Sequence, residues 1–233
     1  MLVSISSFSQ EAMWYHKCSD TILNREYFII CYNKAYKVPN WVSYKMTAHM
    51  ESNDTIPRTD HFKTDSLIKK FSAHPGDYTN SGYQRGHLCS AEDMAWSEAS
   101  MHKTFIMTNV APQNGDLNEK SWYYLEEKVR KWAISEGSVY VTSGTIVEKK
   151  HKTIKNNVAV PSYFYKIVLV EKDMSYKMIA FLFKNEGSNN TLQEHVVSVN
   201  YLESVTGIDF YPELPDGIED ALESSHEVAD WKF

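Results

Sequence analysis

The sequence predicts an α+β fold: a mixed, largely antiparallel β-sheet flanked by helices, in a single domain over residues 1–233. Three observations support this. Strand-like segments lie towards both ends of the chain, one clear amphipathic helix lies between them, and few helical segments separate the later strands. The length of 233 residues is ample for a sizeable core.

The first strands are expected to form a hairpin. The segment "YFIICYN" (27–33) is typical of a buried strand, and "WVSYKMT" (41–47) alternates like a strand with one exposed face. Residues 51–82 are polar and contain two prolines, so we expect a long loop with one short helix near "SLIKKF" (66–71). Loops of this length inside a domain are usually functional.

The middle of the chain predicts a helix followed by a strand. A helix is expected over 90–105, where Ser90 and Asp93 resemble a capped start. The segment "FIMTNVAPQ" (105–113) is then expected to form a strand.

The clearest helix is predicted over 117–136. Asp116 is expected to cap the first turn of this helix, and Gly137 is expected to end the helix. Its apolar residues recur at helical spacing and should face the core; they are Trp122, Leu125, Val129 and Trp132.

The last third of the chain predicts more strands. Segments 138–144, 162–170 and 176–185 are rich in β-branched and aromatic residues. A short helix is expected within 196–207.

Composition excludes several classes of protein. Apolar residues make up 42% and charged residues 23% of the chain, as in ordinary water-exposed globular proteins. No apolar run approaches the roughly 18 residues that a membrane span requires, and the first 20 residues lack the features of a signal peptide.

The net charge of −6 is unevenly distributed. Residues 213–233 hold seven acidic residues and one basic residue, so the remaining 212 residues are neutral overall. Basic clusters stand at 69–70, 128–131 and 149–155. Such clusters attract phosphates whatever the net charge, although each is also typical of a solvated surface.

Three cysteines are too few for a disulfide framework. The chain has no C-x-x-C motif, because its cysteines are far apart at Cys18, Cys31 and Cys89. This disfavours a cysteine zinc site. One disulfide with a thiol left over stays open.

The sequence "GYQRGHL" (82–88) places a histidine next to an arginine and a glycine. An imidazole titrates near neutral pH and suits general-base work, and a guanidinium suits an anionic substrate such as a phosphate. Taken alone, His87 beside Arg85 is weak support for an active site, because a histidine in this setting is more often structural or exposed.

The predicted helix 117–136 offers further polar groups. Asn118 lies in its first turn, Glu126 lies two turns later, and Arg130 is one turn beyond Glu126. At about 100° per residue these side chains share one broad polar flank. A helix cap with a surface ion pair would explain them equally well.

These motifs together resemble the DNA/RNA non-specific endonucleases, which carry a ββα-metal active-site motif. The likeness lies in "RGHLCS", "TNVAPQ" and "LN…W…LE…R" at this spacing, and in "NNVAVPSYFYKIVL" and "VSVNYLESVTGIDFYPELP", which resemble the endonuclease G branch. It covers about 25–215, which leaves an N-terminal extension (1–24) and an acidic C-terminal tail (216–233).

The resemblance implies a division of roles. His87 matches the general base, Asn118 the only direct protein ligand of one Mg²⁺ or Mn²⁺, and Glu126 the carboxylate that holds the metal's waters. Mg²⁺ keeps most of its waters, so a single amide ligand is chemically reasonable. The implied products carry 5′-phosphates.

The arginines follow from the same resemblance. Arg85 matches the arginine of the signature, Arg58 a phosphate-binding arginine in a looser alignment, and Arg130 a helix arginine that supports the site. All three are expected to serve catalysis and substrate binding. Asn109 matches a strand asparagine with a positional role.

One residue departs from the family pattern, in which aspartate usually stands before Arg-Gly-His. Gln84 would hold the metal's waters without a charge, and weaker metal binding would follow. It also raises an alternative function, that of a nucleic-acid-binding homologue with weakened or lost catalysis. A zinc site built from His87, His102 and Cys89 is a third hypothesis.

DNA and RNA are therefore the expected substrates, with no membrane partner. The resemblance implies a homodimer and leaves an inhibitor protein open. The location is not fixed by the sequence, although a secreted or periplasmic bacterial enzyme is weakly favoured.

Overall fold

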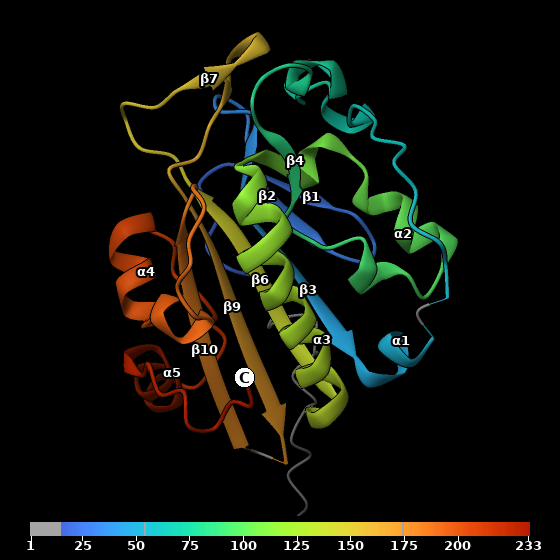
Figure 1. Cartoon of the computed structure of the whole chain (residues 1–233). Coiled ribbons are helices and arrows are strands. Elements are labelled where there is room, and N and C mark those ends of the chain that lie inside the picture. Colours follow the sequence, from blue (N-terminus) through green and yellow to red (C-terminus); the bar gives the residue numbers. More distant parts are fainter. Residues whose placement is uncertain (1–14, 54, 174) are drawn as a thin grey trace, which may run out of the picture.

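The computed structural model describes residues 15–53, 55–173 and 175–233, so part of the N-terminal extension lies outside the described residues. A seven-stranded sheet runs in the order β1-β2-β3-β6-β9-β10-β11, and every strand pairing in it is antiparallel. The α+β prediction is confirmed, with helices on both sides of the sheet (Figure 1).

The strands are β1 (Thr21–Asn24), β2 (Ile29–Asn33), β3 (Val38–Thr47), β4 (Gln84–His87), β5 (Val110–Gln113), β6 (Ser138–Ile146), β7 (Thr153–Ile154), β8 (Val158–Ala159), β9 (Tyr163–Lys172), β10 (Ser175–Lys184) and β11 (Val196–Val197). The α-helices are α1 (Ala48–Ser52), α2 (Glu98–Thr104), α3 (Tyr123–Glu136), α4 (Val199–Thr206) and α5 (Asp216–Ser224). A π-helical segment spans Leu117–Trp122. Short 3₁₀ helices lie at Ser66–Ile68, Pro75–Tyr78, Glu92–Met94, Met107–Asn109, Lys155–Asn157 and Leu192–His195.

The sheet has a hydrophobic core on each face. Strand β9 shows how one sequence serves both: Phe164 and Val168 face the core beneath α3, while Tyr165 and Ile167 face the core beneath α4. This alternation explains why its sequence is apolar almost throughout. Helix α3 lies across one face in Figure 1, and α4 and α5 lie to the other side.

The predicted hairpin and the predicted helix end are confirmed. Strands β2 and β3 pair antiparallel, with Ile30 opposite Val42. Gly137 ends α3 with a φ of 89°, which glycine adopts without the steric cost that a side chain would bring. The four apolar residues of the predicted helix are buried as expected.

The predicted cap at Asp116 is wrong. Asp116 already has helical angles, and its side chain caps nothing. Asn114 performs this role instead, because its Oδ1 accepts hydrogen bonds from the backbone N–H groups of Asp116 (2.9 Å) and Leu117 (3.2 Å).

The predicted helix over 90–105 is also partly wrong. It divides into the 3₁₀ helix Glu92–Met94 and helix α2, which is capped by Ser97. Asp93 cannot cap a helix because its carboxylate is buried and accepts hydrogen bonds from the Tyr44 hydroxyl (2.6 Å) and from Arg130 (3.0 Å).

The acidic tail is partly anchored. Helix α5 lies against β10, and Trp231 beyond it is 5% exposed and packs on Trp132 with ring centroids 4.7 Å apart. The tail is therefore part of the folded structure and not merely a solvated extension. None of the described helices is both long and apolar enough to cross a membrane.

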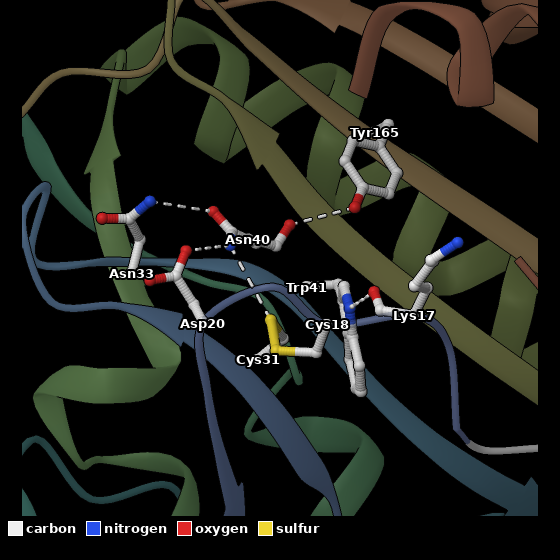
Figure 2. The surroundings of a disulfide bond; sticks show 8 residues. All are labelled: Lys17, Cys18, Asp20, Cys31, Asn33, Asn40, Trp41 and Tyr165. Carbon is white, nitrogen blue, oxygen red and sulfur yellow. Dashed lines mark hydrogen bonds between the residues drawn. A yellow bond between two sulfur atoms is a disulfide. The ribbon is translucent and has the colours of Figure 1, made fainter. Parts of the chain in front are cut away.

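A disulfide joins Cys18 to Cys31, and Cys89 is a buried free thiol. Figure 2 shows this bond next to Trp41, whose indole N–H donates to the carbonyl of Lys17. The bond ties the segment before β1 to the second strand of the sheet.

Removal of this disulfide is expected to destabilise the fold. The bond closes a loop of 13 residues, for which chain entropy predicts a loss of about 3 kcal/mol in the free energy of unfolding. The variant Cys18→Ala leaves the buried Cys31 in place, and urea denaturation measures its effect. Reduction of the unmodified chain should cause the same loss, and no change in either sample would contradict the prediction.

Candidate active site

Strands β4 and β5 and the helix that follows form a ββα unit. The two strands pair antiparallel, with His87 opposite Val110. Asn109 fixes the unit: its Oδ1 accepts from the Cys89 N–H, and its Nδ2 donates to the carbonyls of Cys89 and Thr104, each at 2.9 Å.

A cavity of about 320 Å³ opens where this unit meets the loop before α2. The residues that line it are Arg58, His87, Ser90, Glu92, Asn118, Glu119, Tyr123 and Glu126. Four of the residues singled out in the sequence, from three separate segments, thus meet at one cavity: Arg58, His87, Asn118 and Glu126.

The His87 ring packs in a cluster with two aromatic rings, with centroids 5.2 Å from Phe62 and 5.0 Å from Phe105, which also contact each other at 5.0 Å. Burial in this setting, followed by the charge of Arg58, lowers the pKa of His87 to about 3 against a smaller opposing effect of Glu92. His87 is therefore a neutral imidazole at physiological pH.

We expect His87 and His16 to stay neutral between pH 5 and 8, because burial lowers the pKa of both to about 3. Histidine NMR spectra of the native and urea-unfolded chain would show this, since both residues titrate near pH 6.5 when unfolded. Between pH 3 and 6.5 the unfolded state binds more protons. Each residue's contribution to stability is thus full above pH 6.5 and falls by about 1.4 kcal/mol per pH unit below it. Native signals that shift between pH 5 and 8 would contradict the prediction.

Asn118 is held by the residue that departs from the family pattern. Its Nδ2 donates to Gln84 Oε1 at 2.6 Å, and Gln84 Nε2 in turn donates to Glu119. This contact fixes the Asn118 amide with its nitrogen towards Gln84. Among the described residues no side chain donates to its Oδ1, and Asn118 lines the cavity.

The π-helical segment explains why Asn118 and Glu126 meet. In a regular α-helix the two residues would differ by roughly 80° around the axis. A π turn is wider and rotates less per residue. The segment Leu117–Trp122 therefore turns Asn118 back towards the face of Glu126, and both side chains reach the cavity.

Glu126 is buried above charged neighbours in the sheet. Burial raises the pKa of Glu126. The charge of Lys166 opposes this rise, the charge of Asp93 adds to it, and the charge of Arg130 opposes it. Lys166 is itself fully buried on β9, where its Nζ donates to Ser143 Oγ at 2.8 Å and lies 4.5 Å from the Trp122 ring centroid. The Lys166 cation favours the charged form of Glu126, but burial outweighs it and the pKa stays raised, at about 7.

The three arginines take different positions. Arg58 stands at the rim of the cavity, where Nη1 lies 2.7 Å from Glu92 Oε1. The charge and hydrogen bond of Arg58 bring the pKa of Glu92 to about 2, although burial acts to raise it.

Arg85 and Arg130 do not line the cavity. Arg85 donates to the Pro75 carbonyl at 2.9 Å, and its guanidinium lies 5.2 Å from the Phe62 ring centroid. Arg130 is buried and bound to Asp93. The family resemblance grouped these arginines with Arg58 but could not show which of them opens to the cavity.

The donor set of the cavity fits a hydrated Mg²⁺ or Mn²⁺. The Asn118 carbonyl and the carboxylates of Glu119 and Glu126 offer the oxygen atoms that Mg²⁺ prefers as ligands. Few protein ligands are needed, because Mg²⁺ usually keeps several of its waters. Over residues 15–53, 55–173 and 175–233, no three His, Cys, Asp or Glu side chains converge as a metal site, so the zinc hypothesis of His87, His102 and Cys89 is not supported.

The sequence did not predict the contacts that Glu119, Lys166 and Asp93 make around the site. Lys166 carried a usable signal, since it is a lone lysine within an apolar strand. Glu119 directly follows Asn118, but only the fold shows its contact with Gln84. Asp93 was noticed as a helix cap, which hid its role as the partner of Arg130.

Comparisons with known proteins identify the family of this chain. The family model of the DNA/RNA non-specific endonucleases matches residues 15–217. The chain is 32% identical over 203 residues to "Nuclease EXOG, mitochondrial" of Danio rerio, covering 80% of this chain and 59% of that protein. It is 31% identical over 210 residues to "Nuclease C1" of Cunninghamella echinulata, covering 82% and 83%.

A solved structure is similar too. The chain superposes on a chain of "Crystal structure of the EndoG/EndoGI complex: Mechanism of EndoG inhibition" with a TM-score of 0.79 and 30% sequence identity. The match covers 84% of this chain and 88% of that one. On the matched family model, the ββα unit and the fold, the chain belongs to the DNA/RNA non-specific endonuclease family.

Proposed function

We propose that this chain is a metal-dependent endonuclease that hydrolyses phosphodiester bonds of both DNA and RNA and leaves 5′-phosphates. One observation carries the proposal: the neutral imidazole of His87, the Oδ1 of Asn118 and the carboxylate of Glu126 line one cavity. Contacts to phosphate and sugar carry no sequence information, which fits non-specific cleavage.

In this proposal His87 takes the proton from the attacking water. Its burial keeps it unprotonated, and the rings of Phe62 and Phe105 pack against the imidazole and limit its movement. General-base catalysis of this kind contributes typically 10²- to 10⁴-fold to a rate.

Asn118 would hold the metal directly through Oδ1, and Glu126 would hold it through water. The bound metal would neutralise charge that develops on the phosphate and on the leaving oxygen. Gln84 keeps the Asn118 amide in the required orientation through its 2.6 Å hydrogen bond. Lys166 and Arg130 lie close enough to favour a charged Glu126.

Arg58 is the arginine best placed to contact the substrate phosphate, because its half-exposed guanidinium stands at the rim of the cavity. Arg85 and Arg130 act in the proposal as positioning residues. Arg85 supports β4 through Pro75, and Arg130 supports α3 through Asp93.

Plasmid and single-stranded RNA cleavage in Mg²⁺ and in Mn²⁺ test the proposal, with chelated samples as controls. Ligation of the products to a 3′-hydroxyl acceptor reports whether they carry 5′-phosphates. Failure to cut either nucleic acid in any divalent metal would refute the proposal. The alternative of an inactive binding homologue finds no support, since Gln84 does not disrupt Asn118 but holds it.

The Glu119 carboxylate is expected to supply the negative charge that Gln84 lacks. Glu119→Gln should raise the Mg²⁺ concentration for half-maximal cleavage about 10- to 100-fold, as changes next to a metal's ligands commonly do. Adding Gln84→Asp should reverse much of this change, because it returns a carboxylate beside Asn118.

Mn²⁺ binding by calorimetry gives a readout independent of turnover. Glu127→Gln is the matched control, since Glu127 stands on α3 outside the cavity lining. Equal metal affinity in the Glu119 and Glu127 variants would contradict the role given to Glu119.

Location and assembly stay proposals. The relatives from Danio rerio and Homo sapiens are named mitochondrial, which does not clearly match the secreted or periplasmic setting favoured by the sequence. The Cys18–Cys31 disulfide fits an oxidising compartment. A homodimer and an inhibitor protein remain predictions from the resemblance.

A further inference from the structure

A hairpin rich in lysine stands beside strand β4. It consists of residues 149–159, contains β7 and β8, and is called here the lysine hairpin. Lys150, Lys152 and Lys155 are exposed on it, and among the described residues none of them forms an ion pair. Figure 1 shows β7 at the same end of the molecule as β4. The proposed mechanism makes no use of this charge.

Two hollows lie between the lysine hairpin and the loop that precedes β4. One of about 320 Å³ and one of about 480 Å³ share Tyr83 and Lys152 in their linings. Lys150, His151, Tyr163 and Lys184 also line the first, and Lys155 lines the second. The one carboxylate in either lining is that of Glu148, which accepts a hydrogen bond from Ser162 at 2.7 Å.

The lysine hairpin is fixed relative to the candidate active site. Asn156 Nδ2 donates to Asp77 Oδ1 at 2.5 Å, and Lys37 Nζ donates to the Asn156 carbonyl at 2.8 Å. Asp77 belongs to the 3₁₀ helix Pro75–Tyr78, whose Pro75 carbonyl accepts from Arg85 on β4. These contacts anchor the turn of the lysine hairpin at Asn156 relative to β4.

Tyr83 directly precedes Gln84 on β4, is partly buried, and lines both hollows together with Lys152. The loop before it contains two positive-φ positions, Asn80 at 57° and Gly82 at 81°, and the Ser81 hydroxyl is bonded to the Tyr83 backbone. A tyrosine ring beside a row of free lysines is the arrangement on which unpaired bases stack while their phosphates meet cations.

We propose that Tyr83 and the lysine hairpin form a second binding surface for nucleic acid, which holds an unpaired strand beyond the cavity that contains His87. Phosphates would lie along Lys150, Lys152 and Lys155, and a base would stack on Tyr83. A base within a duplex is already stacked on its neighbours, so this surface favours single-stranded DNA or RNA. The inference rests on the proposed function for its substrate class.

Fluorescence anisotropy with a labelled single-stranded oligonucleotide of about 20 nucleotides, without divalent metal, tests the lysines over a salt series. Removing three lysine–phosphate contacts should reduce the magnitude of the slope of log affinity against log salt by about 2. It should also weaken binding at least about tenfold near 0.1 M salt. The test variant is Lys150→Gln/Lys152→Gln/Lys155→Gln. The matched control is Lys69→Gln/Lys70→Gln/Lys131→Gln, which removes three exposed lysines elsewhere. Equal slopes in the two variants would overturn the proposal.

Tyr83→Ala should weaken single-strand binding about tenfold, and Tyr83→Phe should restore it, because stacking needs only the ring. Binding of a blunt duplex should change less than threefold. An equal loss for both nucleic acids would overturn the preference for an unpaired strand. Cleavage plays no part in these measurements. A chain that binds through the lysine hairpin but cuts nothing would support this inference and refute the proposed function.

Discussion

His87→Ala is expected to lower kcat/KM for plasmid cleavage about 10²- to 10⁴-fold, the usual contribution of a general base. The reason lies in the setting of the ring. Burial keeps the His87 imidazole neutral, and it lines the same cavity as Asn118 and Glu126. Initial rates of supercoiled plasmid nicking, measured at saturating Mg²⁺ and at several pH values, give the effect.

Two controls make this result interpretable. His102→Ala removes an exposed histidine on α2 that does not line the cavity, and it should retain full activity. His102 also belongs to the zinc hypothesis, so equal losses in both variants would favour that hypothesis over a general base. The His87 variant leaves a space beside Phe62 and Phe105, so circular dichroism and urea denaturation are needed to show that it is folded.

Asn118→Ala is expected to reduce cleavage by at least about 100-fold, since replacing groups around a metal's ligands already costs about 10- to 100-fold. The alanine removes both the proposed ligand oxygen and the hydrogen bond to Gln84. Mn²⁺ affinity measured by calorimetry should fall in parallel with activity. Asn118→Asp, which keeps an oxygen donor, should retain metal binding.

Lys120→Ala is the matched control for this site. Lys120 stands two residues further along the π-helical segment, where it pairs with Asp116 at 2.7 Å, and it lies outside the cavity. Unchanged Mn²⁺ affinity in Asn118→Ala would refute the assignment of Asn118 as the direct ligand.

The sequence was informative wherever hydrophobic pattern decided the structure. β9 and β10 were predicted because their residues are buried on both faces of the sheet, which requires nearly continuous apolar sequence. The starts of helices were predicted less well from capping residues. Asp93 has the sequence context of a cap, but its buried bonds to Tyr44 and Arg130 outweigh that local preference.

For the candidate site, motif order predicted which residues belong together but not how they lie. His87, Asn118, Glu126 and Arg58 meet at one cavity, as the combined motifs implied. The inward position of Arg130 and the direct contact of Gln84 with Asn118 depend on tertiary structure and on the π-helical segment. Counting residues along an ideal helix cannot predict the position of Arg130 or the contact between Gln84 and Asn118.

The π-helical segment Leu117–Trp122 has a consequence for how such a site can change. A regular helix would use fewer residues over the same length, so deletion of a single residue there could restore α-helical winding. That deletion would place Asn118 seven residues before Glu126, and seven α-helical steps of about 100° leave the two side chains within about 20° of each other around the axis. Homologues should therefore be able to keep the same pair of residues with either spacing, and alignments of such sequences would need a gap in this turn to match them.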